Sequence, residues 1–154
     1  MTLTLAEDVF RRLMEQDIPL NQHLGLKLEH VDFSKHTVRT RLPIHPTYFG
    51  NAARAMPHGG IISFMIDATA GGAALISRNA LNNPDSLADI DVATIDMRVD
   101  YLQAAKGDVL FASAQVMRAG RRVVMVRSDV HDASGTIVAA GSNVFSVFQT
   151  PRPA

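Results

Sequence analysis

The segment at positions 57–76 reads PHGGIISFMIDATAGGAALI and is apolar on nearly every side. A helix that is apolar all round is a buried helix. Its start is marked by Pro57, which fixes φ just before the small residues Gly59 and Gly60, so that the first N–H groups of the helix stay unobstructed. The sequence therefore predicts one long buried helix from about His58 to Ile76, around which the rest of the chain packs.

Asp67 is the only carboxylate in this segment. An ionised carboxylate in apolar surroundings carries a desolvation cost unless a partner compensates it. One interpretation is a polar stripe of Ser63, Asp67 and Thr69 that faces solvent or a backbone amine. The other is that Asp67 is a functional acid placed in a pocket. Helical geometry alone leaves both interpretations open.

The spacing of His58 and Asp67 restricts how a site can be built. Asp67 follows His58 by nine residues, which on a helix means about 13 Å along the axis and the opposite face. The first N–H groups of a helix need partners, and the helix dipole makes a negative ligand oxygen a natural one. If both ends contribute to one site, a second copy of the helix must run antiparallel beside the first, as in a two-fold dimer. We therefore predict a site shared between subunits.

Composition excludes several classes of protein. The 154 residues suffice for one domain, which we place at residues 1–154. Lys plus Arg and Asp plus Glu number 15 each, so no bulk charge predicts nucleic acid or an acidic membrane as a partner. The chain has no cysteine, which removes disulfides and thiolate chemistry and is consistent with a cytoplasmic protein.

Targeting and metal signals are missing from the sequence as well. The N-terminus lacks the basic-then-apolar pattern of a signal peptide. The six histidines have no spacing typical of zinc ligands, and there is no HExxH motif or glycine-rich nucleotide-binding motif. We therefore expect no metal and no cofactor.

Apolar periodicity predicts the elements around the central helix. Leu5, Val9 and Leu13 form a stripe typical of an amphipathic helix that ends near Gln16. Pro19 is expected to end any continuation, and residues 21–25 to form an irregular connection. Long loops are expected at 43–57 and 79–89. The expected strands cover residues 26–31, 36–42, 94–101, 109–117, 122–130 and 137–148.

The order of these elements predicts the fold class. A helix, two strands, a buried helix and then four strands indicate an α+β fold in which one antiparallel sheet wraps around the central helix. In the strand at 94–101, the apolar residues Ile95, Met97, Val99 and Tyr101 alternate with polar ones and predict a half-buried strand.

Four groups of residues together match one family pattern: Gly50-Asn51, His58-Gly59-Gly60, Asp67, and TIDMRVDYL at 94–102. Over about residues 24–148 the chain resembles the PaaI-type acyl-CoA thioesterases of the hotdog-fold superfamily. The resemblance implies the hotdog fold, a curved antiparallel β-sheet wrapped around a long central helix. It also implies hydrolysis of acyl-CoA thioesters at the interface of a homodimer that often assembles into a homotetramer.

The same resemblance implies roles at the two ends of the expected helix. Gly59 would donate its backbone N–H to the thioester oxygen, with the helix dipole stabilising the oxyanion, and Gly60 would bind the substrate beside it. His58 would shape this end of the helix. Asp67 of the other subunit would act as general base toward water, or as a nucleophile that forms a transient anhydride.

Four further residues are interpreted in the same way, and a fifth, Arg122, is not. Asn51 would position the carbonyl or water, and Thr94 would align the acid. Arg118 and Arg121, near a hairpin tip, would engage the phosphates of CoA. Arg122 is interpreted as an ordinary residue of that turn.

Two other functions stay open at this point. A hotdog-fold dehydratase or hydratase would use the His58 side chain as a base, with Asp67 across the interface, to move protons on an acyl thioester. The two glycines that directly follow His58 favour the thioesterase instead. The same scaffold could also serve as a non-catalytic acyl-CoA binding protein, against which the presence of Asp67 argues.

Overall fold

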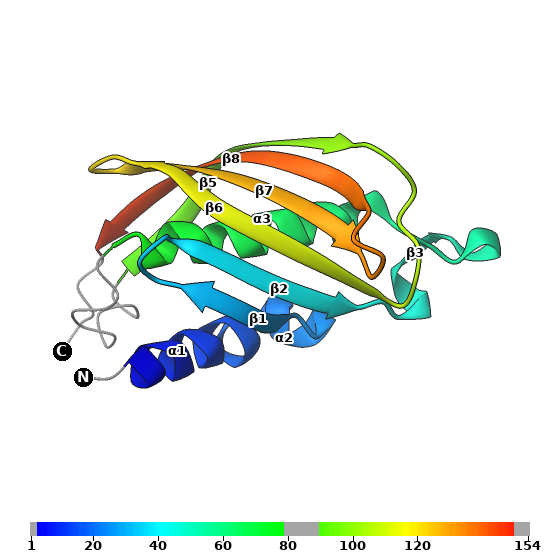
Figure 1. Ribbon diagram of the computed structural model, residues 1–154, viewed down its shortest axis with the longest axis horizontal. Coiled ribbons are helices and arrows are strands. Elements are labelled where there is room, and N and C mark those ends of the chain that lie inside the picture. Colours follow the sequence, from blue (N-terminus) through cyan, green and yellow to red (C-terminus); the bar gives the residue numbers. More distant parts are fainter. Residues whose placement is uncertain (1–2, 79–89, 150–154) are drawn as a thin grey trace.

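The computed structural model describes residues 3–78 and 90–149. Its elements confirm an α+β hotdog fold, with a six-stranded antiparallel sheet arching over one long helix (Figure 1). In chain order the elements are α1 (Leu3–Arg12), a π-helical turn (Leu13–Asp17), α2 (Pro19–Leu24), β1 (Lys27–Asp32), β2 (Thr37–Pro43), β3 (Phe49–Asn51), β4 (Met56–Pro57), α3 (Gly59–Ile76), β5 (Ile90–Tyr101), β6 (Val109–Ala119), β7 (Val123–Asp132) and β8 (Ile137–Gln149).

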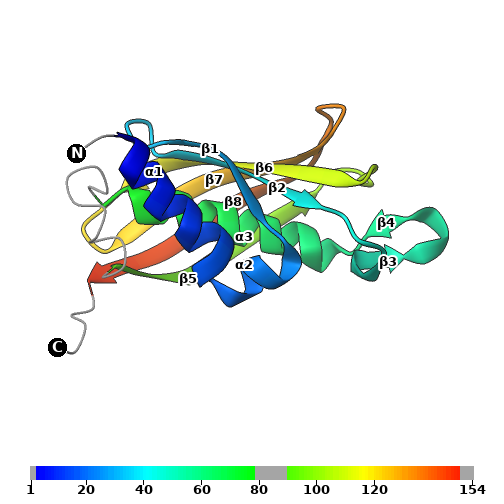
Figure 2. The same cartoon turned by 90° about the horizontal axis from the view of Figure 1, so that it is seen from below.

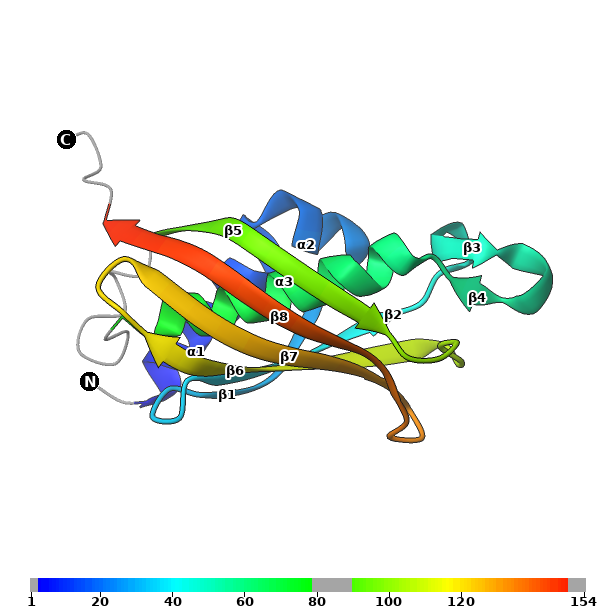
Figure 3. The same cartoon turned by 90° about the horizontal axis from the view of Figure 1, so that it is seen from above.

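The strands follow the order β1-β2-β6-β7-β8-β5, and every neighbouring pair is antiparallel. β5 follows α3 in the chain and forms an outer edge of the sheet beside β8 (Figure 3). α1 and α2 lie across α3 on the side away from the central strands (Figure 2). The short strands β3 and β4 form a separate hairpin just before α3.

α3 confirms the buried helix expected at 58–76, and it packs on the sheet through small residues. Ala70 and Ala73 on α3 and Ala112 on β6 are fully buried. A Cβ added to Gly141 on β8 would lie 2.6 Å from Ile66 Cγ2, so helix and sheet are too close for a side chain there. By length and hydropathy α3 is the one helix among the described residues that could cross a membrane; in this fold it is the core helix.

The expected irregular connection after Pro19 is wrong, because the chain forms a second helix there. Pro19 occupies the first turn of α2, where a missing N–H costs nothing. Ile18, in an extended conformation, separates α2 from the π-helical turn. α2 ends at Gly25, whose φ of 75° lies in the left-handed region that glycine tolerates best.

The expectation for the strand at 94–101 is confirmed in part. The strand begins earlier, at Ile90, and it contains a bulge between Thr94 and Asp96. The bulge leaves Ile95 out of the pairing with β8, and the side chain of Ile95 is 58% exposed. The expected loop at 43–57 contains two 3₁₀ turns and the β3–β4 hairpin, and the expected loop at 79–89 lies outside the described residues.

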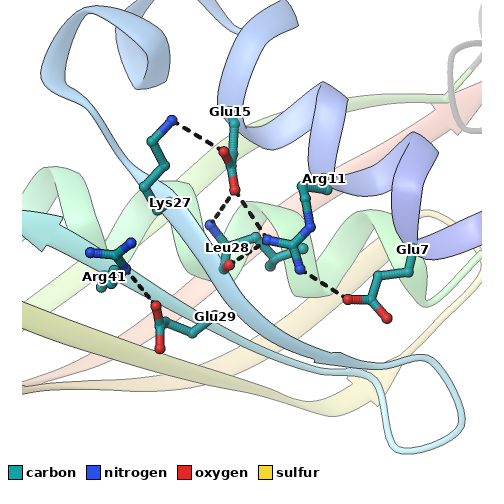
Figure 4. A network of polar contacts seen from close by, with 7 residues as sticks. All are labelled: Glu7, Arg11, Glu15, Lys27, Leu28, Glu29 and Arg41. Atoms are coloured by element: carbon teal, nitrogen blue, oxygen red, sulfur yellow. Dashed lines mark hydrogen bonds and ion pairs between the residues drawn. The ribbon is translucent and has the colours of Figure 1, made fainter. Parts of the chain in front are cut away.

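A polar network ties the first helical segment to β1 (Figure 4). Its centre is Glu15, whose carboxylate accepts the Leu28 N–H at 3.0 Å, Lys27 Nζ at 3.2 Å and Arg11 Nη1 at 3.2 Å. Arg11 also donates to the Leu28 carbonyl and to Glu7. Burial by itself would raise the pKa of Glu15, but the bonds from Leu28, Lys27 and Arg11 outweigh burial and lower the pKa.

Replacing Glu15 with glutamine is expected to lower the free energy of unfolding at pH 7 by about 1–2 kcal/mol, because a charged acceptor with a 13% exposed side chain is lost. Since the folded-state pKa is lowered, this contribution is complete above about pH 4.3 and is lost as the pH falls through the folded-state value. Urea unfolding of the wild type and the Glu15→Gln variant at about pH 7 and about pH 3 measures the size of the loss in free energy of unfolding and its dependence on pH.

The matched control for this substitution is Asp17→Asn. Asp17 pairs with Arg12 at 3.4 Å on the surface, where an ion pair contributes about 0.5 kcal/mol or less. Equal losses in the two variants would contradict the role assigned to Glu15.

Candidate active site

His58 caps the N-terminus of α3. It adopts φ −65° and ψ 139°, and its Nδ1 accepts the Gly60 N–H at 2.9 Å. Because an N–H donates to Nδ1, this atom carries no proton, and in the neutral ring the proton lies on Nε2. A Cβ at position 60 would come within 2.9 Å of Nδ1, so this cap needs a glycine there. The Gly60 amide is therefore occupied by the protein itself.

The neighbouring amide of Gly59 is the free one. Among the described residues, none accepts a hydrogen bond from the Gly59 N–H. Tyr101 lies against the same residue: its hydroxyl donates to the Gly59 carbonyl at 3.0 Å and hydrogen-bonds Ser63 Oγ. A Cβ on Gly59 would come within 3.3 Å of the Tyr101 ring. The helix thus presents one unpaired N–H, reinforced by its dipole, beside an aromatic wall.

The β3–β4 hairpin supports this helix end from outside. The His58 N–H donates to the Tyr48 carbonyl at 2.7 Å, and a Cβ on Gly50 would lie 3.0 Å from His58 Cα. Asn51 is exposed on this hairpin, and its Oδ1 accepts the Arg54 N–H at 3.2 Å. The structure therefore places Asn51 near His58, with its side-chain oxygen used to cap a 3₁₀ turn.

Asp67 lies half-buried in the middle of α3, where β5 reaches it. Thr94 Oγ1 donates to Asp67 Oδ1 at 2.9 Å, so the structure brings these two predicted residues together. Asp67 forms no ion pair with any residue in 3–78 or 90–149. Thr69 is fully buried and hydrogen-bonds Thr40 at 2.7 Å. The polar stripe that included Thr69 is therefore wrong.

Asp67 and Thr94 line a groove of about 690 Å³. α3 forms one wall with Phe64, Ala68, Gly71 and Leu75, and the segment from Arg12 to Asn21 forms the opposite wall. A pocket of this size with mostly apolar walls and a few polar groups is typical of a small-molecule site. The remaining lining residues are the first residues of β5, Gly72 and Phe145.

The sequence matches the family model of the thioesterase superfamily over residues 57–139, which includes both Gly59 and Asp67. The chain belongs to the thioesterase superfamily. The hotdog-fold thioesterase implied by the resemblance is thereby confirmed, and the enzyme is a thioester hydrolase.

Individual relatives agree with this assignment. A Halobacterium salinarum protein whose name proposes an esterase is 39% identical over 140 residues, covering 86% of this chain and 87% of the relative. The medium/long-chain acyl-CoA thioesterase YigI of Escherichia coli is 28% identical over 135 residues, covering 84% and 86%. A crystal structure of a Shewanella oneidensis protein related to the thioesterase superfamily superimposes with a TM-score of 0.76 at 26% identity, covering 94% and 99%.

Within one chain of this thioesterase, Gly59 and Asp67 stay apart. They are eight residues apart on α3, about 12 Å along the axis, and each has its own neighbour on β5. Tyr101 lies beside Gly59, and Thr94 lies beside Asp67. One thioester carbonyl therefore cannot contact both Gly59 and Asp67 of the same chain.

The predicted phosphate ligands lie at the other end of α3. Arg121 and Arg122 line a second hollow of about 560 Å³ together with Arg78, whose Nη2 donates to the Gly120 carbonyl at 2.8 Å. Arg118 is exposed on β6 and does not line this hollow. The structure thus groups Arg121 with Arg122, which sequence reasoning had treated as an ordinary turn residue.

Three residues beside these sites were given no site role by the sequence. Tyr101 and Ser63 lie at the start of α3, and Arg78 lies in the basic hollow. Tyr101 was part of the family pattern, so its position at the end of a strand was available as a signal. Ser63 was noted only as part of a polar stripe beside Asp67, and its contact with Tyr101 depends on the packing of β5 on α3. Arg78 carried no signal, because only the packing of the β6–β7 turn on α3 brings it to the hollow. In residues 3–78 and 90–149, no three His, Asp or Glu side chains are grouped as a metal site would require.

Proposed function

We propose that this thioesterase hydrolyses acyl-CoA to a free acid and CoA at sites shared by two copies of the chain. Gly59 of one copy donates its N–H to the thioester oxygen, and Asp67 of the other copy activates water or attacks directly. The free amide of Gly59 carries the proposal, because it is an unpaired donor at the positive end of a long helix.

The chemistry assigns each residue one task. With Asp67 as general base, the carboxylate takes a proton from water, the water oxygen attacks the thioester carbon, and the developing oxyanion is held by the Gly59 N–H. The C–S bond then breaks, and Asp67 returns the proton to the CoA sulfur. With Asp67 as nucleophile, its oxygen forms an anhydride with the acyl group, CoA leaves, and water hydrolyses the anhydride. Thr94 holds Oδ1 in both cases, which leaves Oδ2 to react.

The edge strand β5 supports pairing of two copies. It exposes apolar side chains along a sheet edge, with Ile95 58% and Tyr101 53% exposed, and an open apolar edge is suited to pair with another strand. Antiparallel pairing that sets residue 94 of one copy near residue 101 of the other brings Asp67 toward the Gly59 of the second copy. We propose a homodimer built in this way, which can assemble further into a homotetramer.

The basic hollow supports acyl-CoA as the substrate. In an antiparallel dimer, the C-terminal end of α3 in one copy lies toward the N-terminal end of α3 in the other. Arg121 at that end can then bind phosphate oxygens of CoA, and guanidinium groups suit phosphate geometry. Arg118 lies at the end of β6 near the same turn and contributes charge from the surface.

The state of His58 argues against a dehydratase. A dehydratase base needs an unprotonated ring nitrogen that faces the substrate. The Nδ1 lone pair of His58 is taken by the Gly60 N–H, so Nε2 carries the proton and is a donor. His58 is therefore unsuited to remove a proton from an acyl chain.

The proposal is tested by assaying acyl-CoA esters with acetyl to hexadecanoyl chains, and one aryl ester, for release of free thiol. We expect thiol release with medium or long chains, consistent with the apolar groove and with the activity named for the E. coli relative. Tight binding without thiol release would identify a binding protein, and hydration of an enoyl-CoA would identify a hydratase; either result refutes the proposal.

A further inference from the structure

The groove beside Asp67 continues along one face of α3. Asp67, Gly71 and Leu75 follow each other at intervals of four residues and all line the groove, as residues on one helix face do. The lining outside α3 includes Leu13 of the π-helical turn and Ile18, which precedes α2. A chain that enters at Asp67 and follows the groove therefore passes over Gly71 next.

The two adjacent glycines of α3 have different surroundings. A Cβ on Gly72 would lie 3.1 Å from Met14 and 3.2 Å from Phe10, so the packing of α1 and the π-helical turn on α3 leaves little room for a side chain at this position. A Cβ on Gly71 would have no neighbour closer than Phe145 Cε1 at 3.7 Å, an ordinary contact distance. Packing therefore gives no reason for a glycine at position 71.

A glycine inside a helix also has a cost. It is less favourable than alanine by about 1 kcal/mol, and α3 is the central helix of the fold. The feature that Gly71 provides is open space above its Cα, and that space belongs to the groove.

We propose that Gly71 determines which acyl chains this enzyme accepts, by leaving the groove open one helical turn beyond Asp67. This inference rests on the proposed function and deepens it, because it names linear chains long enough to pass position 71 as the substrates. The distance from Asp67 to Gly71 is about 6 Å along the helix, equivalent to about four or five carbon–carbon bonds of about 1.5 Å. Chains longer than this contact Gly71, and shorter chains end before it.

The test is the Gly71→Leu variant, in which an isobutyl group fills the groove. We expect the ratio of kcat/KM for dodecanoyl-CoA to kcat/KM for butyryl-CoA to fall by about 10- to 200-fold relative to the wild type. Gly71→Ala is expected to give a smaller change in the same direction. An unchanged ratio, or equal losses for both substrates, would overturn the proposal.

Two comparisons separate this result from other failures. Gly141→Ala on β8, which does not line the groove and whose Cβ would lie 2.6 Å from Ile66 Cγ2, is expected to lower the thermal midpoint and leave the ratio of the two substrates unchanged. Binding of non-hydrolysable S-alkyl-CoA thioethers of four and twelve carbons is then measured by calorimetry. Loss of twelve-carbon binding in Gly71→Leu supports the groove assignment even if no thioester is cleaved, and equal binding of both ligands by the wild type and the variant refutes it.

Discussion

Replacing Asp67 with asparagine is expected to lower kcat/KM for acyl-CoA hydrolysis by about 10²- to 10⁴-fold, because the only acid that faces the groove from α3 no longer accepts a proton or attacks. Asparagine keeps the shape of the side chain and can still accept the Thr94 hydroxyl through its amide oxygen. The fold and the oligomeric state are therefore expected to persist. Steady-state thiol release measures the activity, circular dichroism the fold, and size-exclusion chromatography the oligomeric state.

The matched control is Asp8→Asn. Asp8 is an exposed carboxylate on α1 that does not line the groove, and its replacement is expected to change kcat/KM by about twofold at most. If Asp67→Asn retained full activity, the assignment of the catalytic acid would be wrong.

Replacing Gly59 with proline is expected to lower kcat by about 10²- to 10³-fold, because it removes one oxyanion donor. The backbone accepts proline at this position. Gly59 is the first residue of α3, where proline is favoured, and His58 already has the ψ of 139° that suits a residue before proline. The loss is measured as kcat on the best substrate of the acyl-CoA series.

Gly59→Ala separates the lost amide from steric crowding. Both variants place a Cβ within about 3.3 Å of the Tyr101 ring, but only the alanine variant keeps the N–H. The ratio of their activities therefore reports the contribution of the amide. Equal activities would show that the Gly59 N–H does not stabilise the transition state.

The same two positions test whether the site is shared. Co-expression of the Asp67→Asn and Gly59→Pro chains is expected to restore about a quarter of wild-type activity, since half of randomly formed dimers are mixed and each mixed dimer has one intact site. A site built within one chain would give no recovery, because every chain would carry one defect.

The fold was largely predictable because it depends on patterns that are local in the chain. The apolar run between Pro57 and Ile76 predicts a buried helix from consecutive residues alone, and this helix is α3. Strands in which apolar and polar residues alternate, and which short turns connect, pair with their neighbours in the chain, as β6, β7 and β8 do. Two expectations were wrong, one through a local signal read the wrong way and one through a bulge in strand pairing. α2 forms after Pro19 because Pro19 starts the helix, and the bulge at Ile95 reverses the expected face of one residue.

The sequence predicted individual residues of the candidate site but not their contacts. The family pattern pointed to His58, Gly59 and Asp67, but the sequence did not say that the Gly60 amide is used by the His58 cap while the Gly59 amide stays free. It also did not indicate the groove, whose lining comes mainly from residues 12–21, α3 and the start of β5.

The sequence by itself determined that a long apolar helix with one acid lies at the centre of this protein, and that the acid and the start of the helix are too far apart to act together in one chain. The physical reason is that hydrophobic periodicity and helical rise are properties of consecutive residues. Only the tertiary structure decided what surrounds that acid. Thr94, Tyr101 and the groove wall are brought to α3 by packing between segments distant in sequence, and such contacts depend on the whole folded chain.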